Sequence, residues 1–179
     1  MHTSVKDRRA GNILGAAALA VTDRMLAEAR SGSGLNPTAA AALVHLRLRP
    51  GENIDFLARV VGLSHPAAVR VVDHLVDQRL VERRASRDAR ARALRLTPKG
   101  RRLATRVLRE REQTLADVLR PLSARERETL TRLLEKLLTG VTATRWSARH
   151  ICRLCDYPLC DQPSCPVDQA ACRLEAQVV

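Results

Sequence analysis

Aromatic side chains are almost missing from this chain of 179 residues, which contains one Phe, one Trp and one Tyr. Ala, Leu and Arg favour helices, whereas aromatic residues favour β-strands, so the composition predicts a mainly helical protein. The same scarcity argues against recognition of single-stranded RNA, whose bases stack on aromatic side chains. Apolar residues still make up 45% of the chain, which is enough for one domain of ordinary size with an appendage.

Long apolar runs and nucleotide-binding loops are also absent. No run reaches the roughly 18–20 apolar residues that a membrane span needs. Basic residues precede Ile13–Val21 as in a signal peptide, but this Ala-rich stretch continues as an amphipathic helix. The chain has neither G-x-x-x-x-G-K nor G-x-G-x-x-G, and no nucleophile–base constellation. We therefore predict a cytoplasmic protein with no membrane partner and no enzymatic activity.

Cysteine does not occur before residue 152, and all five cysteines lie in the last 28 residues. A disulfide framework normally runs through a whole fold, and an odd number of cysteines argues mildly against one. The cysteines therefore predict a local centre at one end of the chain.

Positive charge is plentiful and unevenly placed. The net charge is +12, with a pI near 11.0. The segment Arg79–Arg106 contains eleven basic residues and two acidic ones, Glu82 and Asp88, so it carries +9 of that net charge. A solvated helix face is the plainer interpretation, but clustering this tight favours a surface that binds phosphates.

The pattern of apolar residues and helix caps predicts a helix-turn-helix. The expected helices are Gly11–Arg30, a second running from the cap Asn36 to about Arg49, a third at Ile54–Val61 and a fourth at Ser64–Arg79. Ser31–Gly34 reads as a short linker before the second helix. The third and fourth helices are joined by a turn of about three residues containing Gly62, which is typical of this motif.

A basic hairpin follows the fourth helix. Val81–Arg84 and Ala93–Leu96 are expected strands, with the polar segment Ala85–Arg92 between them as a wing. Thr97 and Pro98 restart a helix, and Pro121 with Ser123 separates it from a sixth. The predicted fold is mainly α with a small β-hairpin wing: a winged helix-turn-helix flanked by N- and C-terminal dimerisation helices.

The fourth helix has the two faces expected of a recognition helix. Its apolar stripe of Val and Leu residues would pack on the core, while small and polar residues occupy the other side. The residues expected to contact DNA are Ser64, His65, Arg70 and His74 of this helix, and Arg87, Arg90 and Arg92 of the wing. An ordinary surface helix is the alternative.

These residues resemble the MarR family of winged-helix transcriptional regulators over about residues 10–145. Asp88-Ala89-Arg90 looks like the family's D-x-R wing motif, and Leu96-Thr97-Pro98-Lys99-Gly100 is similar to its L-T-x-x-G. The resemblance implies a homodimer, with the first, fifth and sixth helices intertwined, that binds double-stranded DNA at a pseudo-palindromic operator and usually represses. It also implies that Arg90 enters the minor groove.

The leucines of the fifth and sixth helices predict a dimer independently, because a lone wing domain cannot cover them. We divide the chain into an N-terminal dimerisation helix with linker (1–34), the winged helix-turn-helix (35–100), C-terminal dimerisation helices (101–149) and a Cys-rich tail (150–179).

The tail carries Cys152-x2-Cys155-x4-Cys160-x4-Cys165, which ordinary MarR-type chains lack. We expect these four thiols to lie in a loop and to converge on one metal centre. The Cys165-Pro166 pair favours an Fe–S cluster, whereas the spacing equals that of zinc knuckles with Cys160 in the place of the histidine, so structural Zn²⁺ and a metal-free thiol switch remain alternatives. Cys172 is a spare thiol or an exchange ligand. Trp146 and Tyr157 are expected to pack the tail against the sixth helix.

The function predicted from the sequence is a dimeric MarR-type repressor whose operator affinity is modulated by an Fe–S cluster that senses redox state or iron. The same regulator with structural Zn²⁺ and small-molecule control is the alternative, and an iron–sulfur redox protein is a further one.

Replacing Arg90 by Ala should weaken binding to duplex DNA steeply, because a wing arginine adds positive charge inside a narrow minor groove. A titration with duplex and single-stranded DNA checks this. Single-strand binding as the main activity, unaffected by the change, would contradict it.

Overall fold

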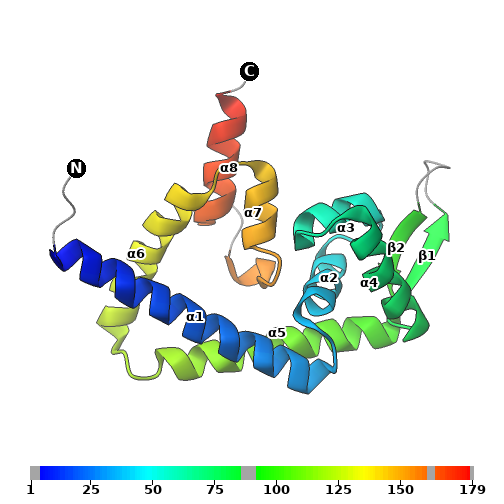
Figure 1. Ribbon diagram of the computed structural model, residues 1–179, viewed down its shortest axis with the longest axis horizontal. Helices are drawn as coiled ribbons and strands as arrows, with labels where there is room; N and C mark the ends of the chain where they lie inside the picture. The colour runs from blue at the N-terminus through cyan, green and yellow to red at the C-terminus, as the bar shows by residue number, and fades with distance from the viewer. Residues whose placement is uncertain (1–4, 86–91, 161–163, 178–179) are drawn as a thin grey trace.

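The computed structural model describes residues 5–85, 92–160 and 164–177, which form helices and one two-stranded hairpin (Figure 1). The element order is α1 (Val5–Ser33), α2 (Pro37–Leu48), α3 (Ile54–Val61), α4 (His65–Asp77), β1 (Val81–Ala85), β2 (Arg92–Leu96), α5 (Pro98–Leu119), α6 (Ala124–Val141), α7 (Arg145–Ile151), the 3-10 helix η1 (Tyr157–Cys160) and α8 (Pro166–Ala176). This mainly helical fold with a small hairpin confirms the predicted fold class.

The core of the winged helix-turn-helix is built around α2. Helix α2 is buried on all sides from Ala39 to Leu46, and α3, α4 and the hairpin pack around it. Helix α4 contributes Ala68, Val72 and Leu75, which are almost fully buried and lie on the apolar stripe that the sequence predicts. Because this stripe faces inward, the opposite face of α4 is left for solvent or a ligand.

Most of the predicted helix ends are confirmed. Helix α3 has the expected bounds and ends at Gly62, whose φ of 72° lies in the left-handed region that suits glycine. The side chains of Asn36 and Thr97 accept hydrogen bonds from the N–H groups of Ala39 and Gly100, as N-caps do. Ser64 precedes α4 as expected but, among the described residues, makes no side-chain cap hydrogen bond.

The hairpin is antiparallel, with Val81 opposite Leu96 and Ala85 opposite Arg92. The turn after α2 also joins it: the Gly51 N–H donates to the Leu94 carbonyl (2.8 Å), and the Leu94 N–H donates to the Glu52 carbonyl (2.9 Å). These bonds fasten the wing to the domain. The tip of the predicted wing, including Arg87, Asp88 and Arg90, lies outside the described residues.

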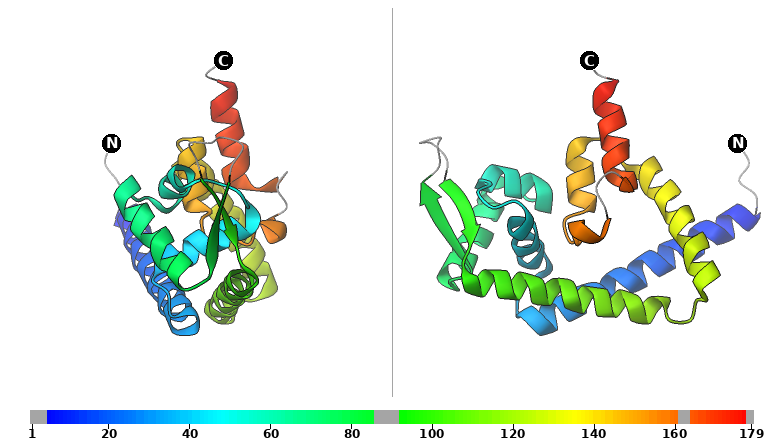
Figure 2. Two further views of the ribbon diagram at one scale, coloured as in Figure 1. Left: turned by 90° about the vertical axis from the view of Figure 1, so that its right-hand side faces the viewer. Right: turned by 180° about the vertical axis from the view of Figure 1, so that it is seen from behind.

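Helices α1 and α5 pack along each other and extend away from the hairpin towards α6 (Figures 1 and 2). The expected linker Ser31–Gly34 is wrong in extent, because α1 continues through Ser33 and is closed by Gly34 at φ 69°. The Ser33 hydroxyl donates to the Ala29 carbonyl, and the Gly34 N–H donates to the Arg30 carbonyl. No helix in the described ranges is long and apolar enough to cross a membrane.

The Cys-rich tail is folded, and the expectation of a loop is only partly correct. It begins in the last residues of α7 and comprises η1 and α8, and Pro166 is the first residue of α8 with Cys165 as its N-cap residue. A proline fits the first helical turn, where its missing N–H would have no partner. The tail folds back: α8 packs on α6, and α7 packs on α3.

The junction between the hairpin and α5 explains Gly100. A methyl group at Gly100 would stand 2.0 Å from the Leu80 carbonyl oxygen, and the Thr97 N–H donates to that same oxygen (3.0 Å). Helix α5 therefore begins directly against the end of the helix-turn-helix, and only glycine permits this approach.

Gly100→Ala should destabilise the protein by about 1–3 kcal/mol, because the backbone must shift to relieve the clash. Gly11→Ala is the matched control: a methyl group there meets nothing within 4 Å. It should stabilise helix α1 by about 0.5–1 kcal/mol. Urea unfolding of both variants measures the difference, and equal stabilities would contradict the proposed role of Gly100.

Candidate nucleic-acid interface and cysteine site

The outward face of α4 carries the residues expected to contact DNA. Arg70 and His74 are exposed on it. Together with small neighbours they line an open groove of about 480 Å³ between α4 and the start of α2, formed by Asn36, Thr38, Ala39, Leu63, Ala67, Arg70, Val71 and His74. A helix with small residues between a few long polar ones can enter a major groove.

Ser64 and His65 lie at the start of α4, and both are exposed. The His65 Nδ1 atom lies 2.5 Å from the Asp55 Oδ1 atom on α3, so the first turn of α4 is tied to the preceding helix. The structure thus gives His65 an intramolecular partner that the sequence did not reveal.

Several of the basic residues around the hairpin have structural partners. Arg83 donates to the Asp73 carboxylate at 2.6 Å, which braces β1 against α4, and Arg84 pairs with Glu82. Lys99 donates to the Gln78 carbonyl, and Arg101 donates to the Leu96 carbonyl. Each of these four basic side chains is thus held by a partner within the domain.

Arg92 is exposed at the start of β2, next to the wing tip. Its position suits a wing contact with DNA, while Arg87 and Arg90 lie outside the described residues. The DNA-contacting roles of all seven residues stay predictions.

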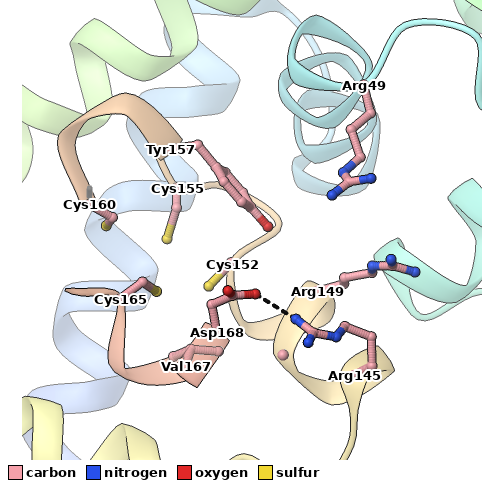
Figure 3. A pocket seen from close by; sticks show the side chains of 11 residues that line it. Arg49, Arg145, Arg149, Cys152, Cys155, Tyr157, Cys160, Cys165, Val167 and Asp168 are labelled. Carbon is pink, nitrogen blue, oxygen red and sulfur yellow. Dashed lines mark hydrogen bonds and ion pairs between the residues drawn. The ribbon is translucent and has the colours of Figure 1, made fainter. Parts of the chain in front are cut away.

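The four cysteines of the tail motif line one cavity of about 190 Å³, and Figure 3 shows their sulfur atoms facing a common space. Cys152 directly follows α7, and Cys155 lies between α7 and η1. Cys160 is the last residue of η1, and Cys165 directly precedes α8. All five cysteines in the described part of the chain are free thiols. No group of three or more His, Cys, Asp or Glu side chains within the described ranges stands close enough together to hold a single metal ion.

The thiols of this cavity differ in acidity. A hydrogen bond from Cys152 to the Cys155 sulfur lowers the pKa of Cys155, and the charges of Arg111 and Arg153 lower it further. The same hydrogen bond, together with burial, raises the pKa of Cys152. Burial also raises the pKa of Cys160. Of Cys152, Cys155 and Cys160, it is therefore Cys155 that most readily becomes a thiolate, the form that binds metals.

Cys172 is not among the residues that line the cavity. Its sulfur lies 3.1 Å from Arg145 Nη2, and Arg145 also pairs with Asp168 (2.5 Å) and Glu175 (2.7 Å). The structure thus separates Cys172 from the four motif cysteines, and its role as a further ligand stays a prediction.

Three arginines at the cavity were not anticipated. Arg145 and Arg149 come from α7, and Arg49 comes from the end of α2, roughly one hundred residues earlier (Figure 3). The i, i+4 spacing of Arg145 and Arg149 was visible in the sequence and places them on one helical face. Nothing in the sequence connected Arg49 with the cysteines.

The aromatic residues of the tail do not behave as expected. Tyr157 lines the cysteine cavity, where burial raises its pKa. Trp146 packs against Phe56 on α3, with ring centroids 5.2 Å apart. The expectation that Trp146 packs the tail against α6 is therefore wrong; α8 makes that contact, through apolar residues such as Val167 and Ala171 near Leu138.

A helix-turn-helix followed by a two-stranded antiparallel hairpin is the winged-helix arrangement of DNA-binding proteins. Residues 33–91 match the model of the MarR family. The chain is 31% identical to a Mycobacterium tuberculosis MarR family protein, Rv2887, in its complex with p-aminosalicylic acid, with 71% of this chain and 96% of that chain covered at a TM-score of 0.57. The chain belongs to the MarR family of DNA-binding transcriptional regulators.

Two further structures agree. Rv2887 in complex with DNA is 26% identical, with 76% of this chain and 98% of that chain covered at a TM-score of 0.59. A probable transcriptional regulator from Pseudomonas aeruginosa is 31% identical, with 69% and 95% covered at a TM-score of 0.56.

Arg70→Ala should weaken duplex binding by about 1–3 kcal/mol, roughly 5- to 150-fold in Kd, if Arg70 contacts a base edge. Arg132→Ala is the matched control, because Arg132 is exposed on α6, away from the α4 face. A fluorescence anisotropy titration at fixed salt measures both. Equal losses in the two variants would show that only general charge matters.

Proposed function

We propose that this protein is a homodimeric repressor that binds a pseudo-palindromic operator. Its affinity for the operator depends on the state of an iron–sulfur cluster held by Cys152, Cys155, Cys160 and Cys165. Membership of the MarR family supports the DNA-binding part of the proposal. The cavity that all four motif thiols share carries the sensing part of the proposal.

The exposed apolar residues of α1 and α6 support the homodimer. At the end of the molecule away from the hairpin (Figure 1), these helices expose Val5, Ile13, Leu14, Leu19, Leu133, Leu134, Leu137 and Val141. A second copy would cover such faces, and two-fold symmetry would present two recognition helices about 34–36 Å apart to successive major grooves.

The residues of the cavity fit an iron–sulfur cluster. Four thiols and no competing carboxylate pair suit iron and sulfide, which thiolates bind preferentially. Each thiol loses its proton on binding, so the liganded site gains negative charge. The charges of Arg111 and Arg153, which lower the pKa of Cys155, offset part of that charge.

The sequence of the motif favours a cluster over zinc. Cys165 is followed directly by Pro166, and a Cys-Pro pair closes the ligand run of bacterial ferredoxins.

Cluster loss would alter the packing of α7 and α8 and thereby the geometry of the dimer. Because operator half-sites are fixed in spacing, a changed distance between recognition helices lowers affinity. The protein would then report redox state or iron supply as a change in operator occupancy.

Protein purified without oxygen should be brown and contain iron and acid-labile sulfide, and Cys155→Ser should lose both, because it removes a ligand from the cavity. Cys172→Ser is the matched control and should keep them, since Cys172 does not line the cavity. Metal and sulfide analysis with an anaerobic absorption spectrum decides the matter. Colourless wild-type protein with stoichiometric zinc would overturn the cluster and leave the regulator intact.

A further inference from the structure

We infer that the cysteine site acts on DNA binding within its own chain, through a clamp formed by Trp146 and His150 of α7 on helix α3. This inference rests on the proposed function, because the clamp needs a cluster whose presence or loss it can transmit. It adds a route by which the state of the cysteines reaches the recognition helix.

His150 closes the end of α3. Its Nδ1–H donates to the Val60 carbonyl at 2.9 Å. That carbonyl belongs to the last turn of α3, where carbonyl groups have no partner inside the helix. The tail therefore supplies a cap that the helix-turn-helix does not provide for itself.

The same imidazole lies on the turn between α3 and α4. A methyl group at Gly62 would stand 2.9 Å from His150 Cε1, so the ring rests directly on the glycine backbone. Gly62 is in the left-handed conformation that redirects the chain into Leu63 and α4. A shift of His150 therefore acts at the hinge that sets the direction of the recognition helix.

Trp146 holds the other end of α3. Its ring meets the edge of Phe56, and Phe56 in turn stacks on the buried His45 of α2, with ring centroids 5.5 Å apart. The guanidinium groups of Arg59 and Arg149 lie 4.8 Å from the centre of the Trp146 ring. Cation–π and aromatic contacts of this kind fix both position and orientation.

Helix α7 presents these two residues on one side and the cysteine cavity on the other. Arg145, Ala148, Arg149 and Cys152 line the cavity, and Cys152 is the C-cap residue whose N–H donates to the Ala148 carbonyl. Seven hydrogen-bonded residues move as a unit. Displacing Cys152 on cluster loss therefore displaces His150 and Trp146.

Leu154 reinforces this connection. It lies between Cys152 and Cys155 in the sequence and packs against the core of the winged helix-turn-helix and against the cluster that joins α1, α2 and α5. Asp156, next to Cys155, lies 3.7 Å from Arg47 on α2. The cysteine segment is thus attached to α2 and α3, the two helices behind the recognition helix.

His150→Ala and His150→Asn test the clamp, since Asn can still present a donor close to the position of Nδ1. Kd is measured for a duplex that wild-type protein selects from a random-sequence pool, using cluster-loaded and iron-depleted protein. For the wild type we expect the two Kd values to differ by about 5- to 150-fold, the usual size of coupling between sites. In His150→Ala the ratio should fall towards 1 with iron and sulfide content unchanged, and His150→Asn should restore most of it.

Trp146→Leu gives a second route to the same readout if His150→Ala folds poorly, and it should also lower the ratio with the cluster retained. Full wild-type coupling in both His150→Ala and Trp146→Leu would overturn the clamp while leaving cluster sensing in place. Wild-type protein that binds no cluster would overturn both. Loss of the cluster in the His150 variants, with normal content in Trp146→Leu and an unchanged ratio, would also overturn the clamp and assign His150 to the cluster site.

Discussion

The edge-to-face contact of Trp146 with Phe56 and the stacking of Phe56 on His45 join parts of the chain that are far apart in sequence. The chain has one Phe and one Trp, and both are used at this contact between the tail and the helix-turn-helix. Because α3 is packed against α4 on one side and α7 on the other, its position depends on both partners. The exposed face of α4 and the cysteine cavity therefore depend on the same helix, α3.

Burial at this support also fixes the charge state of a residue. His45 is 3% exposed, and desolvation lowers its pKa to about 4, with the charges of Arg49 and Arg149 acting in the same direction. The imidazole of His45 is thus neutral near pH 7 and stacks on the Phe56 ring. Between its ordinary pKa of 6.5 and about 4, the unfolded chain binds the proton more readily, so the stability that His45 contributes falls as the pH falls through this range.

The local elements were largely predictable, since short-range rules produce them. The bounds of α3, the caps at Asn36 and Thr97, the start of β1 and the end of β2 follow from side-chain hydrogen bonds and from apolar periodicity. The errors have local causes too. Helix α1 continues through Ser33 because the left-handed residue that closes it is Gly34, and the tail is helical because Pro166 starts α8 instead of breaking the chain.

The sequence by itself determined the winged-helix class, the two-faced α4 and the set of four cysteines, because each depends on residues within one turn or one short motif. Only the tertiary structure decided that Arg49 faces the cysteines, that Cys172 pairs with Arg145 outside the cavity, and that Trp146 and His150 rest on α3. These contacts join segments separated by tens of residues. No periodicity encodes such pairs, since they arise from the direction in which α6 returns the chain towards α3.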